Sequence, residues 1–225
     1  MQKTRRGLIF RTIFLLTALT LFTTSIVFAE TFTPLKKDAL PNSKSTSIIF
    51  GRIYMTSQIG SFNKAPGKTY VFNGIRNNEQ EKVSMTIGIK PLSDEWKGNT
   101  SGVWGYNTFF ALRAEPGDYS FENVTYNFED YYLNPTLHIF INSLTPPFQE
   151  RQLVKAGKLV YFGVIHITFV AFEMTPFNNF NYRHNIYISN DFDNDLKKFK
   201  AAYPKTYKQF KDNIVIADFA NLKRK

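Results

Sequence analysis

The stretch covering residues 109–162 contains the same arrangement twice, a short turn followed at once by a strand-forming segment. Pro116-Gly117 precedes the segment 118–121 (DYSF), and the tripeptide 156–158 (AGK) precedes the segment 159–162 (LVYF). Proline and glycine favour turns, whereas aromatic and β-branched residues favour strands. The repeated pattern is typical of a β-sandwich, and it predicts a fold class rather than a biochemical function.

Other segments between residues 47 and 190 also read as strands. The clearest lies at 82–89, where every second residue is apolar and the residues between them are polar or glycine. Gly51 stands inside the apolar segment 47–55, and a glycine inside a strand indicates a bulge or a close approach of two backbones. We therefore expect an all-β fold, an Ig-like or prealbumin-like β-sandwich of about seven to nine strands.

The chain changes character after residue 190. Four apolar residues recur there at helical spacing and form one stripe: Phe192, Leu196, Phe199 and Tyr203. Aspartates at the start of this segment and lysines further along match the helix dipole, and Pro204 ends the helix. We expect a C-terminal amphipathic helix within a basic appendage, residues 191–225, that packs on the sandwich.

The first 29 residues have the organisation of a secretion signal. Four basic residues and no acidic one come first, an apolar run follows at 12–28, and Val27-Phe28-Ala29 offers a cleavage site after Ala29. An uncleaved anchor is the alternative, but the run is shorter than the about 20 residues that a spanning helix needs. We expect an exported protein, periplasmic or secreted, with residues 30–46 as a flexible leader and residues 47–190 as the sandwich domain.

The absence of cysteine excludes disulfides, a thiol nucleophile and cysteine-ligated metals. Net charge is +10 over the whole chain, but nine basic and two acidic residues lie in 197–225 alone. The helix and the residues after it therefore form a predicted basic surface: Lys197, Lys198, Lys200, Lys205, Lys208 and Lys211. This surface is either a solvated helix face or a contact for anionic envelope material, including a membrane surface. Nucleic acid is not an expected partner, because the net positive charge is concentrated at the C-terminal end and an exported protein does not meet cellular nucleic acid.

Three segments carry a resemblance to a known group of proteins: 49–53 (IFGRI), 116–119 (PGDY) and 156–163 (AGKLVYFG). They resemble exported bacterial proteins with prealbumin-like, carboxypeptidase-regulatory-like β-sandwiches, and the segment 191–204 resembles the helical ending of some of them. The resemblance covers residues 47–204. It implies a sandwich of seven to nine strands with a binding, adaptor or structural role, and it transfers no catalytic residue.

Both tryptophans of the chain lie near each other, in an irregular stretch at 91–105. Together with the next aromatic residue they form the predicted binding residues Trp96, Trp104 and Tyr106. Exposed aromatic rings on a loop offer a contact for a sugar ring or a protein partner, since they supply large area at low entropic cost. The alternative is that these rings fold back and cap the sandwich.

The sequence gives little support for a catalytic site or a metal site. His138 and His166 lie in apolar segments without metal-ligand spacing, and the aspartates at 191, 193 and 195 lack the glycine and glutamate of a calcium loop. The acidic pairs Asp94-Glu95 and Glu129-Asp130 adjoin aromatic residues, as glycosidase carboxylates do, but sequence neighbours seldom converge across a cleft. We predict no catalytic residues, no metal and no cofactor.

The sequence therefore favours an exported, envelope-associated binding or structural module, with a protein as the expected partner. A carbohydrate-binding module that uses residues 96–106 is the alternative, and a hydrolase is a minor one. The oligomeric state stays open.

Overall fold

The computed structural model of this chain describes residues 32–57, 69–77, 81–88, 104–130, 134–141, 150–174 and 180–220. Within these ranges the side chains at 55–57, 69, 104–106, 126–130, 134–141, 169–174 and 180–184 are outside the description. The strands of the described part are β1 (Phe32–Pro34), β2 (Ser47–Ser57), β3 (Thr69–Arg76), β4 (Glu81–Gly88), β5 (Trp104–Ala114), β6 (Gly117–Asp130), β7 (Asn134–Ile141), β8 (Gln152–Val154), β9 (Leu159–Met174), β10 (Phe180–Ser189) and β11 (Ile214–Ile216). The helical segments there are α2 (Phe192–Ala202), α3 (Pro204–Phe210), η1 (Lys211–Asn213) and η2 (Asp218–Ala220).

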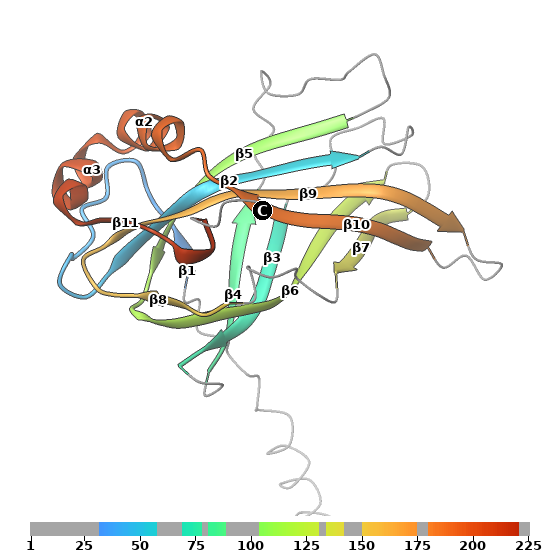
Figure 1. Cartoon of the computed structure of the whole chain (residues 1–225), viewed down its shortest axis with the longest axis horizontal. Coiled ribbons are helices and arrows are strands. Elements are labelled where there is room, and N and C mark those ends of the chain that lie inside the picture. The colour runs from blue at the N-terminus through green and yellow to red at the C-terminus, as the bar shows by residue number, and fades with distance from the viewer. Residues whose placement is uncertain are drawn as a thin grey trace, which may run out of the picture.

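The strands form two sheets that pack face to face (Figure 1). The first sheet has the order β1-β5-β2-β9-β10, with β11 added to β9, and the second has the order β4-β3-β6-β7, with β8 added to β6. This architecture confirms the predicted all-β sandwich. The strands outnumber the expected seven to nine because β1, β8 and β11, three residues each, complete the sheets.

The main core lies between the sheets. The alternation predicted at 82–89 is confirmed, since Val83, Met85 and Ile87 of β4 are buried. Phe72, Phe121 and other inward residues of the second sheet meet inward residues of the first in one cluster. Because side chains alternate along a strand, the same strands leave their other face for a second layer.

A helical layer covers part of the outer face of the first sheet (Figure 1). Phe50 of β2 and Tyr161 of β9 point outward and pack with Phe199 of α2 and Phe210 of α3, all four being buried. The predicted stripe of α2 is confirmed, because its remaining members pack against this cluster. Pro204 separates α2 from α3, as the sequence indicates.

The central pair of the first sheet, β2 and β9, is parallel and contains a bulge. Register shifts between Phe50 and Arg52, so Gly51 lies at the irregularity, and Gly163 on β9 has a φ of +84°. A Cβ placed on Gly51 would lie 2.5 Å from the carbonyl oxygen of Gly163. The close backbone approach predicted from Gly51 is therefore present.

The expected flexible leader needs correction. Residues 32–34 form β1, which pairs with β5, and the side chain of Phe32 is 1% exposed within the main core. Leu35 packs under the helical layer and donates its N–H to the carbonyl oxygen of Ala111 at 2.9 Å. One buried aromatic residue in a short extended segment shows no periodicity, so the pattern at 30–46 did not indicate it.

The segment 191–225 likewise contributes to the sandwich, since β11 pairs in parallel with the start of β9. No helix among the described residues is long and apolar enough to span a membrane.

Candidate functional site

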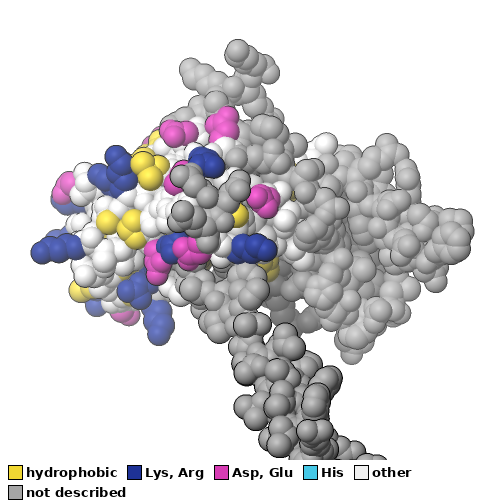
Figure 2. Space-filling view, turned by 90° about the horizontal axis from the view of Figure 1, so that it is seen from below, with side chains coloured by type: hydrophobic (Ala, Val, Ile, Leu, Met, Phe, Trp, Pro, Cys, Tyr) yellow, Lys and Arg dark blue, Asp and Glu magenta, His cyan; other side chains and the backbone are white. Residues whose placement is uncertain are grey.

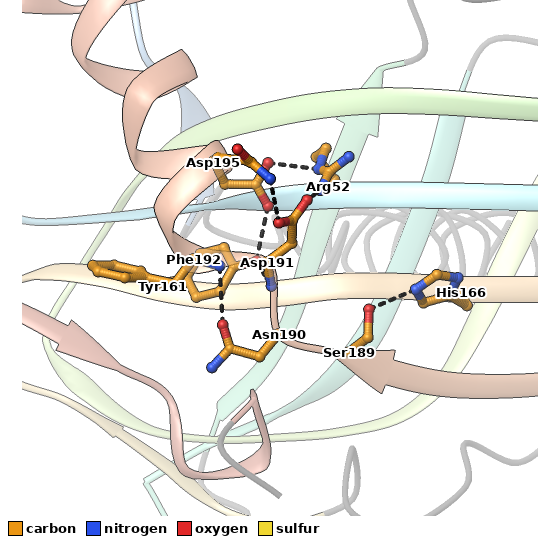
Figure 3. Close-up of polar contacts among 9 residues, drawn as sticks. Arg52, Tyr161, His166, Ser189, Asn190, Asp191, Phe192 and Asp195 are labelled. Atoms are coloured by element: carbon orange, nitrogen blue, oxygen red, sulfur yellow. Dashed lines mark hydrogen bonds and ion pairs between the residues drawn. The ribbon is translucent and has the colours of Figure 1, made fainter. Parts of the chain in front are cut away.

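A polar cluster lies where α2 begins, on the outer face of the first sheet (Figure 3). Arg52 stands two positions beyond Phe50 on β2, so it emerges at the edge of the helical layer. Its guanidinium pairs with Asp191, and its Nε lies 2.5 Å from Oδ1 of Asp195. The Arg52 side chain is 13% exposed and that of Asp195 is fully buried, so this ion pair is shielded from water.

Tyr161 of β9 completes the cluster. Its hydroxyl donates to Oδ2 of Asp195 at 2.8 Å and accepts from the backbone N–H of Asp191 at 3.1 Å. Burial raises the pKa of Tyr161 and also raises the pKa of Asp195, although the Tyr161 hydrogen bond and the charge of Arg52 oppose the shift at Asp195. Tyr161 therefore stays protonated near neutral pH and keeps its role as a donor.

This cluster anchors α2 on the sheet. Oδ2 of Asp195 accepts the Tyr161 hydrogen bond, whereas Oδ1 is in ion-pair contact with Arg52 without hydrogen-bond geometry, and the buried carboxylate is closed to solvent. Asn190, the residue before the N-cap Asp191, accepts from the N–H of Phe192 at 2.9 Å through its side-chain oxygen. A carboxylate enclosed in this way positions a helix and does not react.

A row of side chains continues across the outer face of the same sheet. Asn107, Tyr54, His166 and Tyr187 face one another on β5, β2, β9 and β10, and we call them the aromatic row. The rings of His166 and Tyr187 stack at 4.2 Å, and the Tyr54 ring meets His166 edge-on at 5.5 Å. A ring nitrogen of His166, Nε2, lies 2.7 Å from the Ser189 hydroxyl (Figure 3).

The predicted basic surface covers α2, α3 and η1, and all six of its lysines are exposed. The Nζ of Lys205 lies 3.2 Å from Asp38, and the ammonium of Lys200 lies 5.5 Å above the ring of Tyr207. Figure 2 shows Lys and Arg side chains gathered toward the end of the molecule that carries the helices. Asp195 is buried and paired with Arg52, so its carboxylate is not part of this surface.

The three aromatic residues predicted as a binding loop are only partly placed. Trp96 lies outside the described residues. Trp104 and Tyr106 belong to β5, opposite Ser57 and Met55 of β2, so Trp104 begins a strand and does not lie in the irregular stretch as expected. Their side chains are outside the description.

The other candidate residues, the acidic pairs and the histidines, are also only partly covered by the described structure. Asp94 and Glu95 lie outside the described residues, and Glu129 and Asp130 belong to β6 with side chains outside the description. His138 lies on β7 and His166 on β9, in different sheets, so they do not lie on paired strands. Within the described ranges no group of three or more His, Asp or Glu residues could hold a metal ion.

Sequence reasoning considered Asp195 and His166 as metal ligands, and it did not predict the pairing of Arg52 with Asp195 or the aromatic row. A signal for the pair was present, because Arg52 interrupts an apolar strand and Asp195 lies on the apolar side of α2, three residues after Phe192. Comparisons of the chain with protein-family models, with curated proteins and with solved structures found no match. The resemblance to prealbumin-like sandwiches therefore stays a prediction.

Proposed function

We propose that this chain is a non-catalytic protein-interaction module that contacts a negatively charged partner through its basic surface. The observation that carries the proposal is the helical layer, whose lysines are all exposed while its apolar stripe is buried. Between Phe192 and Asn213 the exposed acidic residues are Asp193 and Asp212 only, against six exposed lysines. Such an imbalance steers an acidic partner toward the surface and favours its correct orientation.

The attachment of α2 to the first sheet supports this proposal. Arg52, Tyr161 and Asp195 hold the start of the helix on the sheet, so its lysines keep fixed relative positions. Preorganised charges lose less entropy on binding than charges on a loose segment do. The signal-like organisation of residues 1–29 supports export, so a partner in the cell envelope is part of the proposal.

Photo-crosslinking in cells that produce the full chain tests the proposal. With a photoreactive residue in place of Lys197 or Lys208, we expect one discrete protein adduct. Charge reversal of the neighbouring lysines should lower its yield about tenfold, because opposed charges at an interface slow association strongly. The matched control carries the same photoreactive residue in place of Leu153, which is 54% exposed on β8 of the other sheet. Equal adducts from the control position, or none from the helical positions, would contradict the proposal.

The aromatic row supports a second candidate, a carbohydrate-binding module. Tyr54 is 38% exposed, and its ring meets the ring of His166 edge-on. A sugar presents an apolar ring face, which matches the exposed ring of Tyr54. This candidate moves the predicted sugar site from residues 96–106 to the face of the first sheet.

Saccharide binding measured on a glycan array and by titration tests this candidate. We expect Tyr54→Ala to weaken binding about tenfold, since an aromatic contact of this kind is worth about 1 kcal/mol or more. Tyr207→Ala on α3 is the matched control and should bind like the unaltered protein. Silence of the array with folded protein, or equal binding by Tyr54→Ala, would remove the candidate.

A further inference from the structure

Among the described strands, one side of the sandwich has sheet edges without a full-length neighbour in both sheets. In the second sheet β4 is the edge strand, and in the first sheet β5 is covered only by the short β1. β1 pairs with Leu112, Arg113 and Ala114, and after Leu35 the chain turns away, with the N–H of Ala39 bonded to the carbonyl oxygen of Lys36. Over Trp104 to Phe110, no strand of the described part pairs with this side of β5.

A hollow of about 310 Å³ lies between these two edges. Its walls include five consecutive residues of β5, 108–112, and three consecutive residues of β4, 86–88. Neighbouring side chains of a strand point to opposite faces, so a consecutive run lines one hollow only along the edge of the strand. The backbone edges of β5 and β4 therefore face this space.

The backbone of β5 has hydrogen-bonding groups to offer there. The carbonyl oxygen of Ala111 accepts from the N–H of Leu35, which shows that the backbone groups of Ala111 point to this side. In an antiparallel ladder the groups of every second residue point the same way, so the N–H and C=O of Phe109 do so as well. Phe109 is the next residue of β5 whose backbone groups point to the side on which β1 pairs. No strand of the described part pairs with Phe109 on that side.

A second hollow of about 970 Å³ adjoins the first, since both are lined by Pro34, Leu35 and Tyr203. Its walls carry Lys36, Lys37 and Arg113 and no acidic residue. The nearby Asp38 is exposed and pairs with Lys205, so it does not neutralise these three cations. The hollows together join a strand edge to a positively charged rim.

We propose that these hollows bind an extended acidic peptide segment of the partner protein, which adds a strand to β5 at Phe109. The peptide backbone continues the ladder of β1, and acidic side chains at one end of the peptide lie against Lys36, Lys37 and Arg113. Addition of a strand to a free edge is a common mode of peptide recognition, with main-chain bonds for affinity and side-chain contacts for specificity. The inference rests on the proposed function, because it names the part of the partner that is recognised.

The test uses the full chain and a synthetic peptide of alternating aspartate and valine as the probe. Fluorescence anisotropy gives its affinity, and amide hydrogen exchange gives its position. We expect the exchange of the Phe109 amide to slow on binding. A peptide N-methylated at alternate residues should bind at least about tenfold more weakly, because it cannot complete the ladder.

Charge variants test the basic rim. The double variant Lys36→Glu/Lys37→Glu should weaken binding of the probe about tenfold, since it replaces attraction by repulsion. The double variant Lys44→Glu/Lys155→Glu is the matched control, with the same change of charge at exposed positions that do not line either hollow. It should bind the probe like the unaltered protein.

Other outcomes overturn the inference. Binding without protection of Phe109, or equal weakening in both double variants, would mean general attraction between charges. Protection of Phe109 that rises with protein concentration and needs no peptide would make a second copy of the chain the occupant. Absence of probe binding with the crosslinks from positions 197 and 208 intact overturns only this inference, whereas loss of both overturns the proposed function as well.

Discussion

Replacement of Arg52 by Met is expected to lower the free energy of unfolding by about 3–5 kcal/mol, the usual cost of removing one partner of a buried ion pair. The reason is Asp195, which is fully buried and would keep only the Tyr161 hydrogen bond. Asp191 contributes less to the loss, because its side chain is 37% exposed and water can solvate it. Chemical denaturation followed by circular dichroism measures the effect.

The double variant Arg52→Met/Asp195→Leu is the control for this reading. It removes both charges, and well-packed apolar residues of similar volume often replace a buried pair at little cost. We expect it to recover most of the stability that Arg52→Met loses. If the double variant is as unstable as the sum of the two single variants, the ion pair is not what couples the two positions.

The stability of the single variant Arg52→Met, relative to the unaltered protein, should depend on pH in a definite direction. Burial raises the pKa of Asp195, so its charge destabilises the fold above the folded-state pKa, and this penalty disappears as the pH falls below the unfolded value of about 3.9. Removal of Arg52 takes away an interaction that opposes the rise. The deficit of Arg52→Met relative to the unaltered protein should therefore shrink as the pH is lowered from neutral toward 4. A deficit that grows on acidification would contradict the assignment.

The sequence predicted those elements in which the spacing of apolar residues itself shows which face is buried. β4 alternates because one face meets the core, and α2 carries its apolar stripe at helical spacing. β1 escaped prediction because it depends on a neighbour. Phe32 is buried only because the distant β5 offers a free edge and the core offers space.

The polar cluster could not be located for a similar reason. Arg52 and Asp191 are 139 residues apart in the chain, and they meet because β2 pairs with β9 and α2 folds back over both. Arg52 in an apolar strand and Asp195 on the apolar side of α2 each indicate a charge that needs a partner. Neither residue identifies the other from its own sequence context. The basic surface could be predicted without knowledge of long-range contacts, because its lysines lie on the side of the helix opposite the apolar stripe.

Gly51→Ala is expected to produce the second largest effect, a loss of about 3 kcal/mol, at the upper end for an overpacked core. The added Cβ would lie 2.5 Å from the carbonyl oxygen of Gly163 and 3.0 Å from Cζ of Phe110. Phe110 can shift its ring, but the carbonyl belongs to the backbone of β9, the central partner of β2. Relief therefore requires the two strands to separate at the bulge, where the packing of both layers depends on their spacing.

Gly117→Ala is the matched control, because it makes the same chemical change at another glycine of the sandwich. Its Cβ would meet Cδ and Cγ of Arg76 at 2.6 and 2.8 Å, and this side chain, although paired with Glu81 and Glu115, can shift without separating two strands. We expect a loss below about 1.5 kcal/mol for this variant. Denaturation midpoints compare the two, and hydrogen exchange along β2 and β9 shows whether the loss is local. Equal losses would mean that the contact between Gly51 and Gly163 does not set the cost, since the entropic effect of Gly→Ala on the unfolded chain is stabilising and is shared by both variants.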